Sequence, residues 1–138
     1  MVWEGEEQHE PQYHHSGDAG FDLVVSEPRV VYPGSFVDVP CGVAVAFPEG
    51  VWGMITGRSS TLRKRKLMVA QGIIDEGYRG PLFAGVWNLG REKTWILDGD
   101  RIAQLVLFRG VAGGVQLERG EVDQETSRGA AGFGSTGS

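Results

Sequence analysis

The sequence predicts an all-β domain, either a barrel or a sandwich. Short segments rich in β-branched and aromatic residues recur along the chain, and Gly or Pro separates them. The chain holds 22 glycines in 138 residues, about twice the average usage of roughly 7%, as expected of short strands joined by tight turns. Turn signals lie between the segments at Tyr32-Pro33-Gly34, Pro48-Glu49-Gly50, Asn88-Leu89-Gly90 and Asp98-Gly99-Asp100.

The expected strands are Phe21–Val25, Val30–Val31, Phe36–Val39, Val43–Phe47, Val51–Thr56, Leu67–Val69, Leu82–Asn88, Thr94–Leu97, Ile102–Phe108 and Val115–Leu117. A single helix of about two turns is expected over Ser59–Lys66, with Ser59 or Ser60 as its N-cap. We expect the barrel domain to occupy residues 1–120. The glycine-rich segment 121–138, called the C-terminal arm below, cannot build its own core and is expected to be flexible.

Composition excludes several classes of protein. The net charge of −5 argues against a protein that coats nucleic acid. The single cysteine, Cys41, excludes an internal disulfide. No apolar run is long enough to span a membrane, and the N-terminus lacks a signal-peptide pattern, so we expect a cytoplasmic protein. We expect the histidines of the polar N-terminal segment, His9, His14 and His15, to be solvated.

The segment RGAAGFGSTGS (128–138) combines the residue types that bind a nucleotide. Glycines leave backbone N–H groups free to face phosphate oxygens, and Ser135 and Thr136 add donors. Arg128 can hold phosphate in a bidentate fork, and Phe133 can stack on a base. The alternative for this segment taken alone is a disordered terminus.

The segment GIIDEGYRG (72–80) is expected to form a β-hairpin that places Asp75 at its turn. A carboxylate at this position can orient a water as a general base. Tyr78 can pack against a sugar and leave no space for an additional hydroxyl. The alternative is a plain hairpin with an exposed acid and a packing tyrosine.

Three more segments carry polar residues at informative positions. GRSS (57–60) places an arginine and two hydroxyls where a strand ends and a helix begins, which is typical of an anion site, although simple N-capping is equally consistent. AGFDL (19–23) places Asp22 among apolar residues, where a carboxylate is paired or functional. GDRIAQL (99–105) places Gln104 in an apolar strand, where it needs a partner.

Taken in chain order, the five segments resemble the five motifs of the trimeric dUTPase family, and the match runs from Ala19 to the C-terminus. AGFDL resembles the first motif, GRSS the second, GIIDEGYRG the third, GDRIAQL the fourth and RGAAGFGSTGS the fifth. The resemblance implies a jelly-roll-like β-barrel of the β-clip type, a fold that is shared with the dCTP deaminases. It also implies a homotrimer with active sites between subunits, in which each arm closes over a neighbour's site. The implied reaction is hydrolysis of dUTP to dUMP and pyrophosphate with Mg²⁺.

The resemblance also implies roles for residues that contact the nucleoside and the attacking water. Asp75 would activate the water that attacks the α-phosphorus, and Tyr78 would pack on the deoxyribose. Phe133 would lie over the uracil. The uracil edge would be bound by the backbone of Gly72, Ile73 and Ile74, with Asn88 nearby.

The resemblance implies a second set of residues, which surrounds the triphosphate. Asp22 would hold a water of the Mg²⁺ shell, while the ion would be bound mainly by the substrate phosphates. The phosphate contacts would come from Arg58, Ser59, Ser60, Gln104 and Arg128, with Gly134, Ser135 and Thr136 wrapping the β- and γ-phosphates.

Two other functions remain possible at this stage. The first is a dCTP deaminase, alone or bifunctional, which in the related family depends on a glutamate in the strand after the third motif. Aligning through Gly80 and Asn88 places Gly85 there, and the segment 81–88 contains no acid. One cysteine cannot supply the ligands of a zinc deaminase. The second is a regulatory protein that binds dUTP and signals through a partner.

Overall fold

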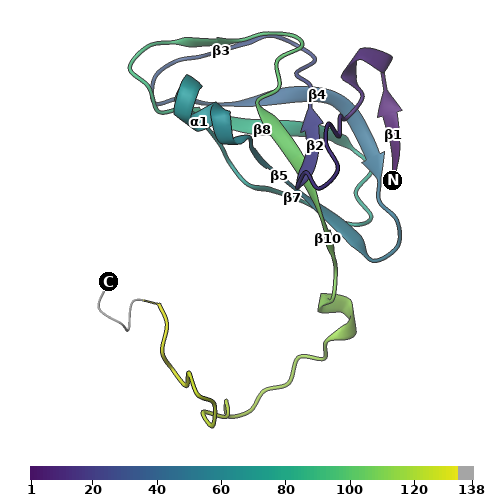
Figure 1. Ribbon diagram of the computed structural model, residues 1–138, viewed down its shortest axis with the longest axis vertical. Coiled ribbons are helices and arrows are strands. Elements are labelled where there is room, and N and C mark those ends of the chain that lie inside the picture. Colours follow the sequence, from purple (N-terminus) through teal and green to yellow (C-terminus); the bar gives the residue numbers. More distant parts are fainter. Residues whose placement is uncertain (134–138) are drawn as a thin grey trace.

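The computed structural model describes residues 1–133, which form two four-stranded antiparallel sheets and a small two-stranded one (Figure 1). The first sheet has the order β1 (Val2–Gly5), β4 (Phe36–Ala46), β8 (Pro81–Asn88), β6 (Leu67–Val69). The second has the order β2 (Gly20–Leu23), β10 (Ala103–Arg109), β5 (Val51–Gly57), β7 (Gly72–Ile74). The third pairs β3 (Arg29–Val31) with β9 (Thr94–Ile96). The predicted all-β, jelly-roll-like fold is therefore confirmed.

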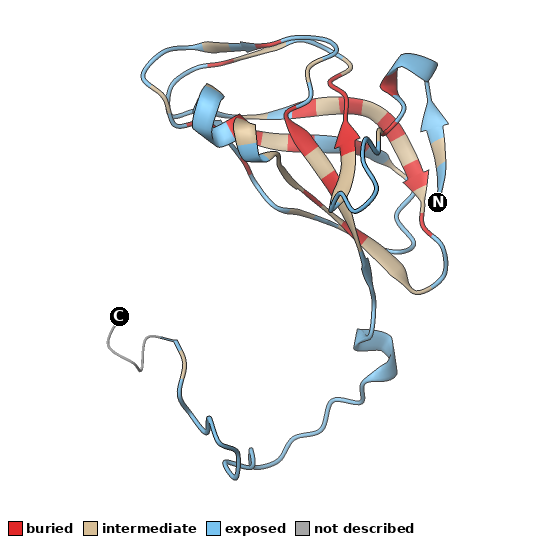
Figure 2. Cartoon of the chain, in the orientation of Figure 1, coloured by how far each residue is buried: buried red, intermediate tan, exposed pale blue. Residues whose placement is uncertain are grey.

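The core lies between the two large sheets and consists of inward-facing aliphatic side chains (Figure 2). Strand β8 shows the period of two expected of a strand with one buried face. Its inward residues are Leu82, Ala84, Val86 and Asn88. Its outward residues include Phe83 and Trp87, which are about half exposed. The structure therefore leaves large aromatic side chains on the outer face of the first sheet.

Strand β4 replaces the two strands that the sequence predicted on either side of Pro40 and Gly42. The pairing with β8 shifts register between Pro40 and Ala44, so the chain continues through a bulge instead of turning. Gly42 has φ = +69°, a conformation that a glycine adopts without steric cost. Pro40 and Gly42 do mark an interruption of the hydrogen-bond ladder. The prediction that two separate strands flank them was wrong, because one strand continues through the interruption.

The predicted hairpin over 72–80 is also wrong. Strand β7 pairs with β5 in the second sheet, whereas β8 pairs with β4 and β6 in the first. Residues 75–80 are thus a connection between sheets, which begins with a turn closed by a bond from the Tyr78 N–H to the Asp75 carbonyl (3.1 Å). Asp75 still lies at a turn, as predicted.

Helix α1 (Ser59–Arg65) is the expected helix, but neither serine is its N-cap. Arg58 occupies that position with an extended backbone and no capping side chain, so the serine hydroxyls are not used to start the helix. Thr61 anchors the helix to the barrel by donating its hydroxyl to the Ile102 carbonyl at 2.7 Å. Within residues 1–133, no helix has the length and apolar character needed to cross a membrane.

The chain leaves the barrel after β10 (Figure 1). A short 3-10 turn, η2 (Ala112–Gly114), follows, and residues 115–133 contain no further helix or strand. The predicted strand Val115–Leu117 is therefore wrong, because no strand of the described chain lies beside it to pair with its backbone. Leu117 and Val122 are 98% and 80% exposed, so this part of the chain has apolar side chains that its own barrel does not cover.

Candidate active site

An arginine–carboxylate pair joins β2 to the residue that follows β5. Arg58 Nε lies 3.0 Å from Asp22 Oδ1, and Asp22 is only 8% exposed. Arg58 also donates from Nη1 to the Arg101 carbonyl at 2.9 Å. Asp22 was expected to be paired or functional, and the structure shows that it is paired.

Gln104 faces the same cluster from β10. The strand register places it opposite Asp22 on β2 and opposite Thr56 on β5. Its Nε2 donates to the Gly57 carbonyl at 3.1 Å, which is the partner that an amide in an apolar strand requires. The first, second and fourth of the sequence segments therefore meet at one place.

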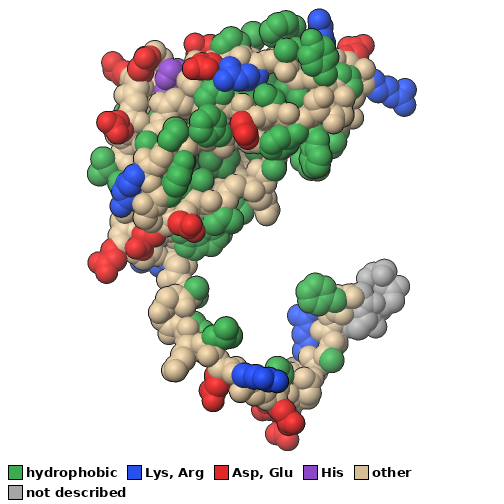
Figure 3. Space-filling model, turned by 180° about the vertical axis from the view of Figure 1, so that it is seen from behind, with side chains coloured by type: hydrophobic (Ala, Val, Ile, Leu, Met, Phe, Trp, Pro, Cys, Tyr) green, Lys and Arg blue, Asp and Glu red, His purple; other side chains and the backbone are tan. Residues whose placement is uncertain are grey.

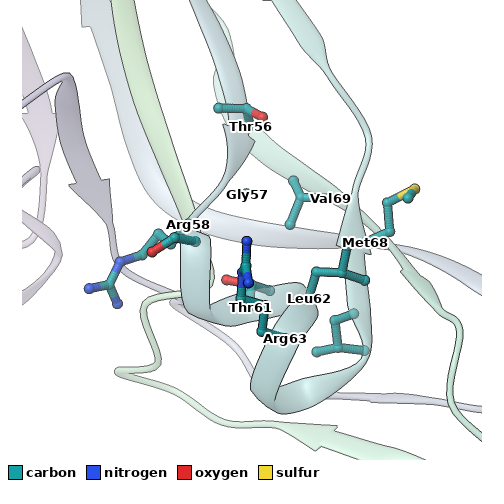
Figure 4. A pocket seen from close by; sticks show the side chains of 10 residues that line it. Thr56, Gly57, Arg58, Thr61, Leu62, Arg63, Met68 and Val69 are labelled. Atoms are coloured by element: carbon teal, nitrogen blue, oxygen red, sulfur yellow. The ribbon is translucent and has the colours of Figure 1, made fainter.

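These residues line a polar hollow of about 480 Å³. Ser59, which is exposed, contributes to its wall. The lining is His14, His15, Asp18, Ala19, Gly20, Asp22, Arg58, Ser59 and Gln104. A smaller hollow of about 260 Å³ lies beside α1 and β6, and the Arg58 guanidinium points away from it (Figure 4). The polar hollow is therefore the one suited to an anion.

His14 belongs to this cluster, although sequence reasoning placed it in a solvated segment. Its Nε2 lies 3.0 Å from Asp22 Oδ2. Backbone bonds between Gln12 and Asp22 (2.8 and 2.9 Å) hold the N-terminal segment against β2. The expectation of a solvated ring was wrong for His9, which is buried against Gly42, whereas His14 and His15 are exposed, as expected. No motif indicated either position, since both depend on pairing between segments.

The third segment forms a separate, acid-bearing site at the end of β7. The side chain of Asp75 is exposed, and the Tyr78 hydroxyl donates to the Pro81 carbonyl at 2.9 Å, which fixes the ring beside it. These residues line a hollow of about 200 Å³ together with Ile73, Ile74 and Phe83. Strand β7 is the edge of its sheet, so one row of its backbone groups faces no strand of the described chain.

The two sites lie at opposite ends of β5. Ile74 is opposite Gly53, so antiparallel pairing brings Asp75 beside Trp52, and both residues line a larger open hollow of about 690 Å³. Arg58 follows the other end of the strand. From Trp52 to Arg58 the strand spans about 20 Å, at a rise of about 3.3 Å per residue. One copy of the chain therefore does not bring Asp75 to its own Arg58–Asp22 pair.

Asn88 has a different place from the one that the resemblance implied. It is 1% exposed, and its Nδ2 donates to the carbonyls of Val31 (2.9 Å) and Glu92 (2.8 Å). Its Oδ1 accepts from the Gly90 N–H at 2.8 Å. The amide is thus occupied within its own barrel, and this position gives no support to a contact with uracil.

The described part of the C-terminal arm does not reach either site of its own barrel (Figure 1). Arg128 Nε donates to the Ala131 carbonyl at 2.6 Å, within the arm itself. Phe133 is fully exposed. Gly134, Ser135 and Thr136 lie outside the described residues.

Gly85 occupies the position where deaminase chemistry would place a glutamate. A Cβ atom added there would lie 2.5 Å from Cζ of Phe36, so any side chain at this position requires that ring to move. The outer face of β8 is therefore shaped for a glycine, which argues against a proton-transferring acid at this position.

An exposed acid beside an edge strand, and an arginine–carboxylate cluster at a separate strand end, define a β-barrel protein of the class that binds nucleoside phosphates. The dUTPase family model matches residues 6–137, and the chain belongs to the dUTPase family.

Relatives with known names are similar over most of the chain. The deoxyuridine 5'-triphosphate nucleotidohydrolase of avian adenovirus 8 is 43% identical over 127 residues, covering 92% of this chain and 77% of the relative. The protein of that name from Thermobifida fusca is 42% identical over 135 residues, covering 92% and 72%. Among solved structures, a mutant dUTPase of Staphylococcus bacteriophage 80alpha with dUpNHpp has a TM-score of 0.86 at 27% identity, covering 99% of each chain.

Proposed function

We propose that the chain is a dUTP diphosphatase, which hydrolyses dUTP to dUMP and pyrophosphate. The observation that carries this proposal is the position of Asp75, exposed at the end of edge strand β7 and beside the fixed ring of Tyr78. A carboxylate there can accept a proton from a water as that water attacks the α-phosphorus. Curated relatives at above 40% identity bear the corresponding name.

The nucleoside binds at the edge of β7. The backbone N–H and C=O groups of Gly72, Ile73 and Ile74 pair with the uracil edge, because this row has no strand partner in the described chain. Cytosine exchanges donor and acceptor at that edge and leaves both sides unpaired, so it is rejected. The ring of Tyr78 packs on the deoxyribose and excludes a 2′-hydroxyl.

The triphosphate binds at the polar hollow around Asp22. Arg58 neutralises phosphate charge, Ser59 and Ser60 donate hydroxyls, and Gln104 contributes its amide. Arg128 and Phe133, with Gly134, Ser135 and Thr136, come from the arm of another copy, close over the bound nucleotide and exclude water.

The residues of the polar hollow fit Mg²⁺ bound mainly through substrate. Within residues 1–133 there is no cluster of three or more His, Cys, Asp or Glu that could hold a metal. Mg²⁺ keeps several waters and binds phosphate oxygens, so a single carboxylate, Asp22, suffices to hold a water of its shell. When bound, the ion neutralises phosphate charge.

The active enzyme is a homotrimer whose sites lie between subunits. The separation of about 20 Å along β5 prevents one copy from placing Asp75 at the phosphate that its own Arg58 holds, since a general base must reach its water at about 3 Å. The outer face of β4, β8 and β6 carries exposed Phe36, Phe83, Trp87 and Met68. Such an exposed apolar face is typical of a contact between subunits. Hydrophobic side chains also gather on the surface in Figure 3. Phe83, on this face, lines the same hollow as Asp75.

A pyrophosphate-release assay with dUTP, dCTP, dTTP and UTP, with and without Mg²⁺, tests the proposal. We expect turnover of dUTP alone, dependent on Mg²⁺, and a fall of about 10²- to 10⁴-fold in Asp75→Asn with nucleotide binding retained. Glu76→Gln is the matched control, because the neighbouring acid accepts from the Gly50 N–H and does not line the hollow that Asp75 shares with Tyr78. Equal turnover in wild type and Asp75→Asn would remove Asp75 from the mechanism. Release of ammonia from dCTP would instead support the deaminase function.

A further inference from the structure

We propose that His14 is a positioning residue for Asp22, and that it sets the affinity of the polar hollow for the metal–nucleotide complex. This inference rests on the proposed function and adds to it a residue that lies outside all five motif segments. The observation behind it is that His14 and Arg58 contact different oxygens of the Asp22 carboxylate. In the Nε2–H tautomer His14 donates to Asp22 Oδ2 (3.0 Å), so the same nitrogen does not accept from Arg101 Nη1, which lies 3.2 Å away. Arg58 pairs with Asp22 Oδ1 (3.0 Å) and donates to the Arg101 carbonyl (2.9 Å).

The His14 ring is held in this position by its own segment. Gln12 and Asp22 exchange two backbone bonds, so the residues that follow Gln12 run beside β2. The Tyr13 hydroxyl then closes the next turn, donating to the Asp18 carbonyl (2.9 Å) and accepting from the Gly17 N–H (3.1 Å). The ring of Tyr13 packs on Phe21 with centroids 5.4 Å apart. The N-terminal segment is therefore built to present His14 to Asp22.

The contact from His14 decides how the carboxylate of Asp22 is oriented. Arg58 engages only Oδ1, and His14 engages only Oδ2. An ionised carboxylate offers about four acceptor positions, so one position on each oxygen remains for water. Without His14, nothing in the described chain holds Oδ2, and the carboxylate can rotate toward bidentate pairing with Arg58. That rotation would fill the acceptor positions of the Asp22 carboxylate that a water of the metal shell needs.

His14 orients Asp22, which in turn holds a water of the metal shell, so His14 is an outer partner of the bound metal. Removing one typically lowers metal affinity about 10- to 100-fold. In the proposed trimer the general base at this hollow is the Asp75 of another copy, and His14 acts on it only through the position of the bound nucleotide. We therefore expect His14→Ala to raise the KM for dUTP and the Kd for dUpNHpp, both measured with Mg²⁺, by about tenfold, with little change in kcat.

The test compares wild type, His14→Ala, His14→Gln and Ser16→Ala in the full chain. Binding of dUpNHpp is measured by calorimetry with and without Mg²⁺, and kcat and KM are measured separately with dUTP. Gln supplies an N–H donor of similar reach, so it should recover most of the affinity. Ser16 is the control, because it is exposed in the same segment and does not line the polar hollow.

A double-mutant cycle with Asp22→Asn shows whether His14 acts through Asp22. His14→Ala should cost affinity in the wild-type background and almost none in the Asp22→Asn background. Additive losses overturn the proposal, as does wild-type binding by His14→Ala or an equal loss in Ser16→Ala. If His14→Ala does not fold, the comparison uses His14→Gln. The proposal is overturned if folded His14→Gln binds dUpNHpp no more tightly than Asp22→Asn does. A wild-type chain that does not hydrolyse dUTP contradicts the proposed function, whereas the binding comparison still tests His14.

Discussion

Arg58 Nε lies 3.0 Å from Asp22 Oδ1, and this ion pair joins the residue after β5 to a carboxylate that is almost fully buried in β2. The same guanidinium donates from Nη1 to the Arg101 carbonyl. A planar fork can make both bonds at once, whereas an ammonium group cannot reach both partners. The orientation of Arg58, and with it the shape of the polar hollow, therefore depends on Asp22.

The first prediction follows from this pair. Arg58→Lys keeps the charge but loses the fixed geometry, so the Kd for dUpNHpp with Mg²⁺ should rise about ten- to a hundredfold, the value of a hydrogen bond to a charged group. Calorimetry measures the change, and Arg63→Lys on the neighbouring helix is the control. Equal affinities for Arg58→Lys and wild type would show that the fork is not used in binding.

The second prediction concerns the C-terminal arm. Deletion of residues 128–138 should abolish most dUTP hydrolysis and leave the oligomer intact, because the proposed subunit contact is the outer face of β4, β8 and β6 and the barrel core includes no described residue of this segment. Light scattering after gel filtration measures the oligomer. Arg128→Ala should reproduce part of the loss, whereas Arg119→Ala, also exposed, should not. Dissociation of the truncated protein would assign the segment a structural role.

The third prediction concerns Cys41. Burial raises the pKa of its thiol to about 12, and the residue is 2% exposed. The thiolate is the reactive form, and at pH 8 a thiol with this pKa remains protonated, so the native protein should not react with a thiol reagent. The unfolded chain should release one equivalent of chromophore per chain, since Cys41 is the sole cysteine. Rapid reaction of the folded protein would contradict the burial.

The fourth prediction tests the close approach of β2 to β10. A Cβ atom at Gly20 would lie 2.7 Å from the Leu105 carbonyl oxygen and 3.1 Å from Oε1 of Gln104. Gly20→Ala should therefore lower the free energy of unfolding by about 1–3 kcal/mol, and it should displace the Gln104 amide. Thermal unfolding measures the first effect. Gly113→Ala, with open space around the added atom, is the control and should unfold like wild type.

The fifth prediction concerns the sugar. The Tyr78 ring is fixed by its bond to the Pro81 carbonyl, so it acts as a rigid wall. Tyr78→Ala should reduce the ratio of kcat/KM for dUTP over UTP by about tenfold or more. Tyr78→Phe keeps the ring and should retain most of that ratio. Unchanged discrimination in Tyr78→Ala would mean that another group excludes the ribose hydroxyl.

Local patterns in the sequence predicted much of the fold. The strands at 51–56, 67–69 and 82–88 and the helix that begins at Ser59 lie within one or two residues of their expected bounds. The errors arose where pairing between segments decides the structure. Gly42 indicated a turn but forms a bulge, because β8 continues to pair on both sides of it. Val115–Leu117 has strand composition, but no partner in the described chain.

The sequence by itself determined the all-β class, the turn position of Asp75 and the need of Asp22 and Gln104 for partners, because these depend on residue type and on neighbours in the chain. Only the tertiary structure decided that Arg58 is the partner of Asp22, that His14 completes the cluster, and that Asn88 is occupied inside the barrel. It also decided that β5 separates Asp75 from Arg58. The physical reason is that strand pairing joins residues far apart in sequence, and its register depends on the packing of the whole barrel.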